Sequence, residues 1–360
     1  MTRHIVPPRA AVPVVGFVAS GNLANDTICI LWNHLVRRDD LDCRIFTDGF
    51  LIGDLRTLSG AQPIEELLNA PEAVNAVVLS IRSPGETERR LLMRCREAGV
   101  PTILILADCG SGAQKFVEHG AFVWPDRLCV ADSVTLAQMT AAGAPAEILR
   151  PAGSPYLDYI GRAAAAPAHN PPPGRLGYFC DVPNRDDFLT WGKPVAYDED
   201  KVVEGLQTAA QLRPDWRFVV RPHPKQLHAR LAPGQQDEDL SSRRPLHEVL
   251  PKYALCVSTY STALLVSVRV GVPAVSFQPN ETAKVRENLY RAVGIPIVTT
   301  PQALASVLDT PPVPDPQRLE SILFNPGSAT EYLEGIIVEA ARSCTSGRRI
   351  DAAVERCRVS

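Results

Sequence analysis

Arg221 and His223 stand two residues apart in the segment Arg221-Pro-His-Pro224, directly after the apolar run Trp216–Val220. In an extended segment, side chains two positions apart leave the same face, so a guanidinium and an imidazole can converge on one anionic group. The two prolines have a fixed φ and no N–H, so strand pairing is expected to stop here and the loop to be stiff. Packing alone does not explain a histidine in this setting, with Lys225 nearby. We interpret the segment as an anion-binding site.

Hydroxyl groups gather in a second segment, Ser258-Thr-Tyr-Ser-Thr262, between an apolar strand candidate (Ala254–Val257) and an apolar helix candidate (Ala263–Val270). The start of a helix offers free N–H groups and a positive partial charge, and hydroxyls beside it add donors for a phosphate. The same hydroxyls also serve as ordinary helix caps. The two segments together predict a cradle for a phosphorylated ligand, with hydroxyls from Ser258, Thr259, Ser261 and Thr262.

Composition argues against several classes of partner. The 360-residue chain is 45% hydrophobic and 21% charged, with a formal net charge of −3, and it is long enough for two domains. This balance gives no general attraction for nucleic acid or an anionic membrane, and no apolar run approaches the ~20 residues that span a bilayer. Residues 1–13 lack the apolar core of a signal peptide. We therefore expect a cytoplasmic monomer or homodimer with no nucleic-acid partner and no membrane span.

The cysteines and paired carboxylates do not predict a metal site. The nine cysteines are scattered, mostly within apolar segments, as is typical of core residues in a reducing compartment, and no two have the spacing of a zinc pair. Cys109, beside Gly110, is the candidate for a catalytic thiol, and we interpret it as a core residue because only a helix N-terminus could activate it. Asp198-Glu-Asp200 and Asp237-Glu-Asp239 are interpreted as surface or capping groups. We expect no metal and no cofactor.

Short apolar runs alternate with helix-like segments, which is the rhythm of parallel sheets flanked by helices. In the first half the strand candidates are Pro13–Ala19, Cys43–Thr47, Ala76–Ile81, Thr102–Ala107 and Arg127–Val130. Apolar residues recur at helical spacing in Thr27–Arg37, Glu86–Ala98 and Val134–Ala142. The pattern predicts one open α/β domain over residues 1–162.

The rhythm restarts after a Pro- and Ala-rich stretch, residues 163–174, which we interpret as a linker. The second set of strand candidates is Leu176–Cys180, Arg217–Val220, Leu255–Val257, Ala274–Phe277 and Ile297–Thr299. The helix candidates are Glu199–Leu212, Ala263–Val270, Ala283–Ala292 and Gln302–Leu308. We expect a second α/β domain over residues 175–325, then a helix over 326–342 that packs across both domains, and a loosely ordered tail, 343–360.

The motifs and their order resemble the GT-B superfamily of glycosyltransferases and UDP-N-acetylglucosamine 2-epimerases. The resemblance rests on Arg221-x-His-Pro224 after a strand, a hydroxyl turn before a helix that ends in Gly271-Val-Pro273, and Ser276-Phe-Gln-Pro279. Three segments of the first half resemble the end of that family's N-terminal domain: Asp126–Asp132, Gly143–Leu149 and Gly153-Ser-Pro155. Within the superfamily the chain is most similar to the bacterial capsule-polysaccharide, teichoic-acid, CDP-glycerol, sialyl-type and Kdo-type transferases.

This resemblance implies a GT-B fold, with two facing Rossmann-like domains, an interdomain cleft and a C-terminal helix that crosses back. It implies that Arg221 and His223 meet the diphosphate or the leaving nucleotide, in a donor site with Lys225 and Gln278. The implied function is a metal-independent glycosyltransferase in polysaccharide biosynthesis, which moves a sugar from a nucleotide-activated donor to an acceptor. Donors aimed at the charge that develops on the leaving group lower such a barrier without a metal.

A transferase acting by direct displacement also needs a base for the acceptor proton, which in GT-B enzymes usually comes from the first domain. The candidates are carboxylates at strand ends: Asp26, Asp48 and Asp108. Each also has a structural interpretation as a helix cap or turn residue. The segment Gly16–Gly21 lacks dinucleotide-binding spacing and is expected to let an acceptor or sugar approach the backbone. The residues expected at the cleft are Gly21, Asn22, Gly153 and Ser154.

One position departs from the family pattern. In many relatives the helix after the hydroxyl turn carries a ribose-binding Glu, five residues before the Gly of Gly-x-Pro, and here that position is Val266. The departure counts against a standard UDP-sugar pocket. Two alternatives stay open on the same fold. One is CDP-polyol phosphotransfer or nucleotide-sugar 2-epimerisation, and the other is binding of a nucleotide or sugar phosphate without turnover.

Overall fold

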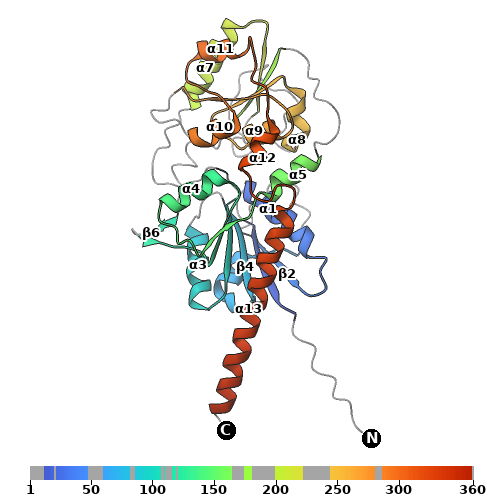
Figure 1. Ribbon diagram of the computed structural model, residues 1–360, viewed down its shortest axis with the longest axis vertical. Helices are drawn as coiled ribbons and strands as arrows, with labels where there is room; N and C mark the ends of the chain where they lie inside the picture. Colours follow the sequence, from blue (N-terminus) through green and yellow to red (C-terminus); the bar gives the residue numbers. More distant parts are fainter. Residues whose placement is uncertain are drawn as a thin grey trace.

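The structure of the chain is a computed structural model that describes residues 12–19, 22–47, 60–81, 86–106, 109, 116–118, 121–163, 174–180, 199–221, 244–279 and 286–358. Two α/β domains are stacked along the long axis of the molecule (Figure 1). Each holds a parallel sheet flanked by helices, so the predicted fold class is confirmed. Within the described part of the chain, no helix combines the length and the apolar character of a membrane span.

The first domain is built on a seven-stranded parallel sheet with the order β3-β2-β1-β4-β5-β8-β9. Its strands are β1 (Val14–Ala19), β2 (Asp42–Thr47), β3 (Gln62–Pro63), β4 (Ala76–Ile81), β5 (Thr102–Leu106), β8 (Arg127–Val130) and β9 (Leu149–Pro151). A separate antiparallel pair is formed by β6 (Val117–Glu118) and β7 (Ala121–Phe122). The strand order reverses between β1 and β4, where Ala19 pairs with Ser80. Open α/β sheets bind ligands beyond the carboxyl ends of the strands at such a point.

Side chains of successive β4 residues pack on opposite faces of this sheet. Val77 and Leu79 belong to a cluster with α3, whereas Ala76 and Val78 belong to a cluster with α1 and the C-terminal helix. This alternation buries both faces, as expected of a parallel sheet covered on both sides. The helices of the domain are α1 (Asn22–Leu35), α2 (Ile64–Asn69), the short 3₁₀ helix η2 (Pro71–Ala73), α3 (Glu86–Glu97) and α4 (Ser133–Ala141).

Helix α1 begins earlier than the sequence pattern predicted. Apolar spacing indicated a start at Thr27, but the helix starts at Asn22. The first turn was not predicted because Asn22-Leu-Ala-Asn25 adds little to an apolar repeat. Asp26 therefore lies inside α1, and its interpretation as a cap at the helix start is wrong.

The second domain is built on a five-stranded parallel sheet with the order β11-β10-β12-β13-β14. Its strands are β10 (Arg175–Phe179), β11 (Arg217–Arg221), β12 (Leu255–Ser258), β13 (Ala274–Phe277) and β14 (Ile297–Val298). Its helices are α7 (Glu199–Leu212), α8 (Leu246–Val249), η6 (Leu250–Lys252), α9 (Ala263–Arg269), α10 (Glu287–Val293), α11 (Pro301–Val307) and α12 (Pro316–Ile322). The strand order reverses beside β10, with β11 on one side and β12 on the other.

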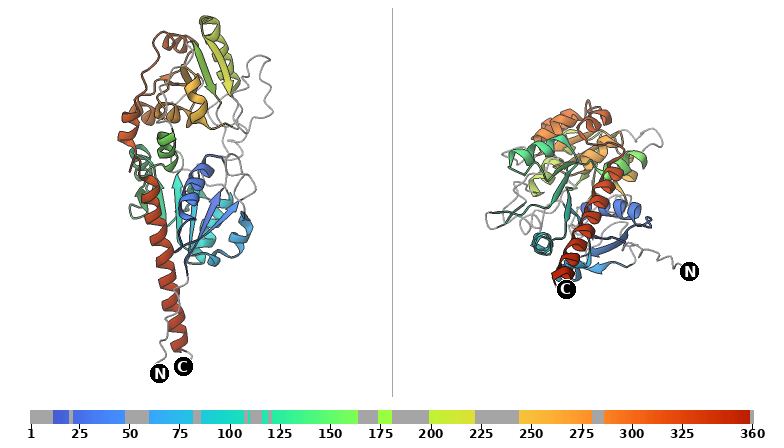
Figure 2. Two further views of the ribbon diagram at one scale, coloured as in Figure 1. Left: turned by 90° about the vertical axis from the view of Figure 1, so that its right-hand side faces the viewer. Right: turned by 60° about the horizontal axis from the view of Figure 1, so that its bottom comes forward.

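Helix α5 (Pro155–Ala163) joins the two domains. It packs against α1 of the first domain and α9 of the second. Leu157 and Ile160 belong to the hydrophobic cluster of the second domain, which also takes in Cys109 and Ala131 from just beyond β5 and β8. The carboxyl ends of these two strands therefore meet the second domain. In Figure 2 the two sheets likewise lie end to end along the molecule.

The chain returns to the first domain just before α13 (Ala329–Arg358), and two residues of the crossover hold it there. Gly153 has φ +89°, and a Cβ on it would overlap the carbonyl oxygen of Phe324. The carboxylate of Asp158, only 3% exposed, accepts hydrogen bonds from the N–H groups of Gly327 (2.7 Å) and Ala329 (3.0 Å). Asp158 thus satisfies the free N–H groups at the start of α13 and places a negative charge there.

Helix α13 runs along the first domain, as both views of Figure 2 show. Its apolar side, from Leu333 to Ala341, packs in the cluster that includes Val15, Phe17 and Ile28. The predicted C-terminal helix that crosses back is confirmed. The expected loosely ordered tail is wrong for residues 343–358, which continue the helix. Apart from Gly347 this stretch has no helix breaker, and its arginines, alanines and glutamate favour a helix.

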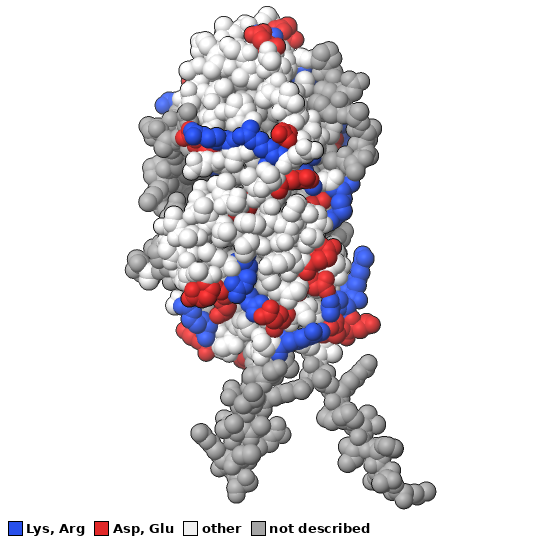
Figure 3. Space-filling model, viewed as in Figure 1, with Lys and Arg blue, Asp and Glu red and all other residues white. Residues whose placement is uncertain are grey.

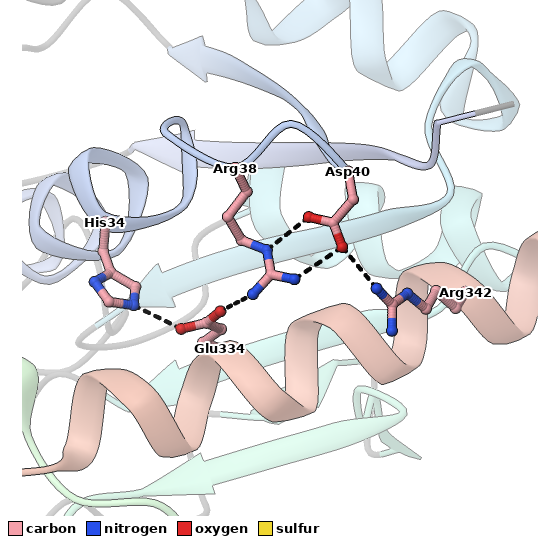
Figure 4. Close-up of polar contacts among 5 residues, drawn as sticks. All are labelled: His34, Arg38, Asp40, Glu334 and Arg342. Atoms are coloured by element: carbon pink, nitrogen blue, oxygen red, sulfur yellow. Dashed lines mark hydrogen bonds and ion pairs between the residues drawn. The ribbon is translucent and has the colours of Figure 1, made fainter.

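A network of charged side chains adds to this packing (Figure 4). The Nε2 atom of His34 lies 2.6 Å from Oε2 of Glu334, and Arg38 bonds both Glu334 and Asp40. Arg342 donates to Asp40 at 2.6 Å. Burial alone would raise the pKa of Glu334, but the bonds from His34 and Arg38 outweigh it and lower the pKa. The network joins α1 and the turn after it to α13.

We expect Asp40→Asn to flatten the acid limb of the stability profile. The hydrogen bond from Arg38, and then its charge, lower the pKa of Asp40 to about 2, below the value of ~3.9 expected when the chain is unfolded. Its contribution is therefore present above pH 4 and is lost as the pH falls toward 2. Because the pair of Arg38 and Asp40 is exposed, we expect it to contribute less than about 1 kcal/mol to the free energy of unfolding. Urea unfolding of the wild type and of Asp40→Asn at pH 5 and pH 2.5 measures this. If both proteins lose the same free energy of unfolding between the two pH values, the prediction is contradicted.

Charges of both signs lie side by side on the face shown in Figure 3. The ion pairs include Arg213 with Asp215 and Asp309, and Arg291 with Glu287. Most are exposed pairs of the kind that contributes little to stability.

Candidate functional site

The structure describes some of the predicted site residues and not others. His223, Lys225, Asp48, Asp108 and Gly21 lie outside the described residues, as does the side chain of Asn22. Their roles stay predictions. The described ones lie at the ends of strands beside the two reversal points: Arg221 ends β11, Ser258 ends β12, and Asp26 lies on α1 after β1.

Arg221 is a buried cation with an unused donor. Its side chain is 7% exposed, and Nη2 donates to the carbonyl oxygen of Arg244 at 2.6 Å. Its Nη1 atom is buried and has no hydrogen-bond partner in the described structure. Burial lowers the pKa of Arg221, but an arginine stays protonated at neutral pH. A buried guanidinium nitrogen without an acceptor costs free energy, so the site favours an anion that supplies one.

The Arg221 guanidinium lies over the ring of Phe179, one of two aromatic rings in edge-to-face contact. Its Cζ lies 5.7 Å from the ring centre of Phe179, which contacts Tyr253 edge-to-face at 5.8 Å, and Arg175 lies 5.0 Å over Tyr253. Gly177 leaves room for this pair of rings, because a Cβ there would lie 2.8 Å from the Phe179 ring and 3.0 Å from the Tyr253 ring. Cation–π contacts of this kind favour the charged side chain in a fixed place.

The hydroxyl turn is braced by hydrogen bonds to β10 and to residues at the end of β13. The Ser258 hydroxyl donates to the carbonyl oxygen of Phe179, and the Ser276 hydroxyl donates to that of Thr259. Nε2 of Gln278 donates to Ser276 Oγ at 2.8 Å and lies 3.4 Å from the Thr259 oxygen. The Ser261 hydroxyl accepts from the N–H of Ala263 at 3.3 Å.

These contacts give Ser258, Ser261 and Gln278 a part in shaping the turn. Helix α9, which follows, has only seven residues. Contact of the turn with a phosphate, including the part predicted for Thr259 and Thr262, stays a prediction. Val266, at the family's ribose-binding position, is fully buried in the hydrophobic cluster of the second domain and presents no polar group.

Tyr156 is a residue that the sequence analysis missed. It lies in the first turn of α5, and its ring packs against the hydrophobic cluster of the second domain. Burial raises the pKa of Tyr156, the charge of Asp26 raises it further, and the charge of Arg221 lowers it. The charges of Asp26 in the first domain and Arg221 in the second therefore act on Tyr156 in opposite directions.

A signal for this helix was present in the sequence. Ser154 followed by Pro155 is a typical N-cap with proline at the first helical position, and Ser154 Oγ accepts from the Leu157 N–H at 3.2 Å. Gly153 and Ser154, predicted as cleft residues, are accounted for in this structure by the backbone crossing and by this cap. A contact of either with a ligand stays a prediction.

Cys109 lies in an environment that suits a core residue. It is 3% exposed, and its thiol bonds the buried carboxylate of Asp132. Asp132 also accepts from the N–H of Thr135 at 2.8 Å and caps α4. A neighbouring carboxylate does not favour a thiolate, which agrees with the structural interpretation. Among the described residues, no group of three or more His, Cys, Asp or Glu side chains is arranged to hold a metal ion.

No protein-family model matches the chain, and no curated protein matches its sequence. Solved structures do match. The co-structure of S. aureus MnaA with UDP has a TM-score of 0.58 at 13% identity, covering 89% of this chain and 94% of that one. The wall teichoic acid polymerase TagF has a TM-score of 0.59 at 15% identity, over 92% and 89% of the two chains.

UDP-GlcNAc 2-epimerase from Neisseria meningitidis, bound to UDP-GlcNAc, has a TM-score of 0.54 at 11% identity, over 91% of this chain and 99% of that one. Identities this low establish shared architecture and not shared chemistry. The two parallel-sheet domains, the crossover through α5 and the returning α13 agree with that architecture. The chain therefore has the GT-B fold, which it shares with MnaA, the Neisseria meningitidis epimerase and the teichoic acid polymerase.

Proposed function

We propose that the protein transfers a sugar from a nucleotide-activated donor to an acceptor, without a metal ion. The observation that carries the proposal is the buried guanidinium of Arg221, whose Nη1 has no acceptor in the described structure, at the carboxyl end of β11. This is where an open α/β sheet binds its ligand. The GT-B neighbours include proteins solved with UDP and with UDP-GlcNAc, which supports a nucleotide as that ligand.

In this proposal the bond between the anomeric carbon and the phosphate oxygen breaks, and the acceptor oxygen bonds the anomeric carbon. The electron pair of the broken bond goes to the diphosphate, whose growing charge is stabilised by Arg221 and His223. The acceptor proton goes to a carboxylate of the first domain, Asp26 or Asp108. Arg221 is suited to its part because its contact with the Phe179 ring and its hydrogen bond to the Arg244 carbonyl oxygen already hold it in place.

Arg221→Gln is expected to abolish nucleotide binding, because it removes the charge and the unused Nη1 donor. Thermal melting with UDP, CDP, CMP, GDP, ADP and dTDP measures this, since a ligand that binds only the folded protein raises the melting temperature. One nucleotide should stabilise the wild type. With its donor sugar, kcat/KM of the variant should fall about a hundredfold.

Arg217→Gln is the matched control, because Arg217 lies on the same strand and is exposed. It should respond to the nucleotide as the wild type does. Equal rises in melting temperature with the nucleotide in Arg221→Gln and Arg217→Gln would contradict the role of Arg221. A wild type whose melting temperature rises with none of the six nucleotides would contradict the proposed donor class.

A second candidate function is nucleotide or sugar-phosphate binding without turnover. The burial of Val266 favours it, because the ribose contact of many relatives is absent at this position. Incubation with a panel of UDP-, CDP- and CMP-activated donors separates the two. Release of the nucleotide supports transfer, and a phosphorus-containing product would indicate polyol phosphate transfer instead. Binding with no release supports the second candidate.

A further inference from the structure

Ser80 lies at the point where the strand order of the first sheet reverses. It is the last residue but one of β4, and it pairs with Ala19 at the end of β1 and with Ile105 of β5. Open α/β sheets bind ligands beyond this end of their strands, at such a point. The strand pairing therefore places Ser80 at the ligand-binding end of the first domain.

The hydroxyl of Ser80 is buried and makes no hydrogen bond. The side chain is fully buried, and Oγ has no partner in the part of the chain that the structure describes. Such a hydroxyl costs free energy, so its position favours a ligand that supplies a partner. Arg221 shows the same combination in the second domain, with a buried polar atom that lacks a partner beside a reversal of strand order.

Helix α1 begins on the side of the sheet that this hydroxyl faces. Ala76 and Val78 pack in the cluster with α1, and residues two apart on a strand share a face, so the side chain of Ser80 also faces α1. The helix starts at Asn22, three residues after Ala19, the strand partner of Ser80. This short connection keeps the start of α1 within about 10 Å of Ala19.

The start of α1 is suited to an oxyanion. The helix has 14 residues, and the first N–H groups of an α-helix have no partner within it and carry a positive partial charge. Its first turn, Asn22–Asn25, contains no acidic residue that would neutralise this charge. A phosphate or carboxylate at this place can accept hydrogen bonds from these N–H groups and from the Ser80 hydroxyl.

We infer that Ser80 is an acceptor-binding residue, whose hydroxyl and the first-turn N–H groups of α1 together bind a phosphate or carboxylate group of the acceptor. The inference rests on the proposed function, in which a carboxylate of the first domain takes the acceptor proton, and it adds the chemical class of the acceptor. Asp26 follows in the second turn of α1, so an acceptor bound at the helix start lies near one of the two candidate bases.

Ser80→Ala tests the inference, and Ser267→Ala is the matched control. Ser267, within α9, is also fully buried with an Oγ that lacks a partner among the described residues, but it does not lie at the end of a strand. Each change removes a buried hydroxyl that makes no hydrogen bond, so both variants should melt about 2 °C above the wild type without ligand. If Ser80→Ala melts below the wild type, its hydroxyl has a partner in the free protein and the inference is wrong.

Titration with inorganic phosphate and with acetate at constant ionic strength measures anion binding through the rise in melting temperature. The titrations use proteins that also carry Arg221→Gln, which removes the proposed anion site of the second domain. We expect Ser80→Ala to weaken binding of the anion about tenfold and Ser267→Ala to leave it unchanged. A response to phosphate alone indicates a phosphorylated acceptor, and a response to acetate alone indicates one that carries a carboxylate.

Binding of neither anion would overturn the inference, and so would equal binding by the Ser80 and Ser267 variants. Both results leave the proposed function standing, because nucleotide binding through Arg221 is measured independently in proteins with an intact Ser80. If no nucleotide binds the wild type, the proposed function fails and the acceptor role of Ser80 fails with it, even where the anion titration shows binding at α1.

Discussion

Gly153→Ala is expected to lower the free energy of unfolding by about 4 kcal/mol. Two effects add. Gly153 has φ +89°, where an L side chain is strained, and its Cβ would overlap the carbonyl oxygen of Phe324 and lie 2.8 Å from the Cβ of Ala329. A backbone carbonyl cannot move aside as the end of a flexible side chain can. The returning segment would have to shift before α13. Urea unfolding monitored by circular dichroism measures the loss.

Gly143→Ala separates the two effects. Gly143 has a similar φ of +82° at the end of α4, but nothing lies within 4 Å of a Cβ there. It should cost only the strain of the left-handed conformation, about 1 kcal/mol. If the two variants lose the same stability, the contact with Phe324 contributes nothing and the crossing is looser than the structure indicates.

Asp158→Asn is expected to destabilise the protein by about 3 kcal/mol. The buried carboxylate accepts from two N–H groups, those of Gly327 and Ala329, with one oxygen each. An amide offers one acceptor oxygen and turns an NH₂ group toward the second N–H, so a buried donor loses its partner. The charge that favours the start of α13 is also lost. Denaturant unfolding gives the magnitude, and amide hydrogen exchange should show faster exchange in α13.

The comparison variant is Asp315→Asn. Asp315 is an exposed cap of α12 and accepts from the N–H of Arg318 at 2.9 Å. Asparagine caps a helix as well as aspartate, so this change should cost less than about 0.5 kcal/mol. Unchanged exchange in α13 of the Asp158 variant would show that apolar packing alone holds the helix.

Buried parallel strands were the easiest elements to predict from the sequence. Strands β4, β8 and β13 and helix α7 have the predicted bounds. The strands are short apolar runs between turn residues, a local signal that needs no knowledge of the partner strand. Strands β3 and β9 have two and three residues, too few to produce any pattern.

Helix α5 was missed because its apolar character is sparse. Within its nine residues, only Leu157 and Ile160 are large, aliphatic and fully buried, and its helical conformation is supported by packing between two domains. Tyr156 was missed for the same reason. The effect of the Asp26 and Arg221 charges on its pKa depends on how two separate domains meet, and no spacing along the chain carries that information.

The individual hydrogen bonds of the hydroxyl turn could not be predicted from the sequence either. Residue types predicted a polar turn after β12, and the turn is there. That Ser258 and Ser276 bond backbone carbonyls depends on the register of neighbouring strands, which places Ser276 beside Ser258. Such contacts are visible only once the sheet is assembled. The prediction of Arg221 as a site residue rests on local features, namely its charge, its position after an apolar run and the proline that follows it.

The path of α13 has a consequence for how the chain folds. Leu333, Ile337 and Ala341 complete a hydrophobic cluster whose other members, including Val15 and Phe17, come from the very first strand. During synthesis the end of α5, at Ala163, emerges 166 residues before Ala329, where the helix that covers this side of the first sheet begins. Contacts of such long sequence separation form slowly, and apolar surface waits exposed meanwhile. The first domain can therefore bury this side of its sheet only after α13 has left the ribosome, whereas the sheet of the second domain is complete before α13 begins.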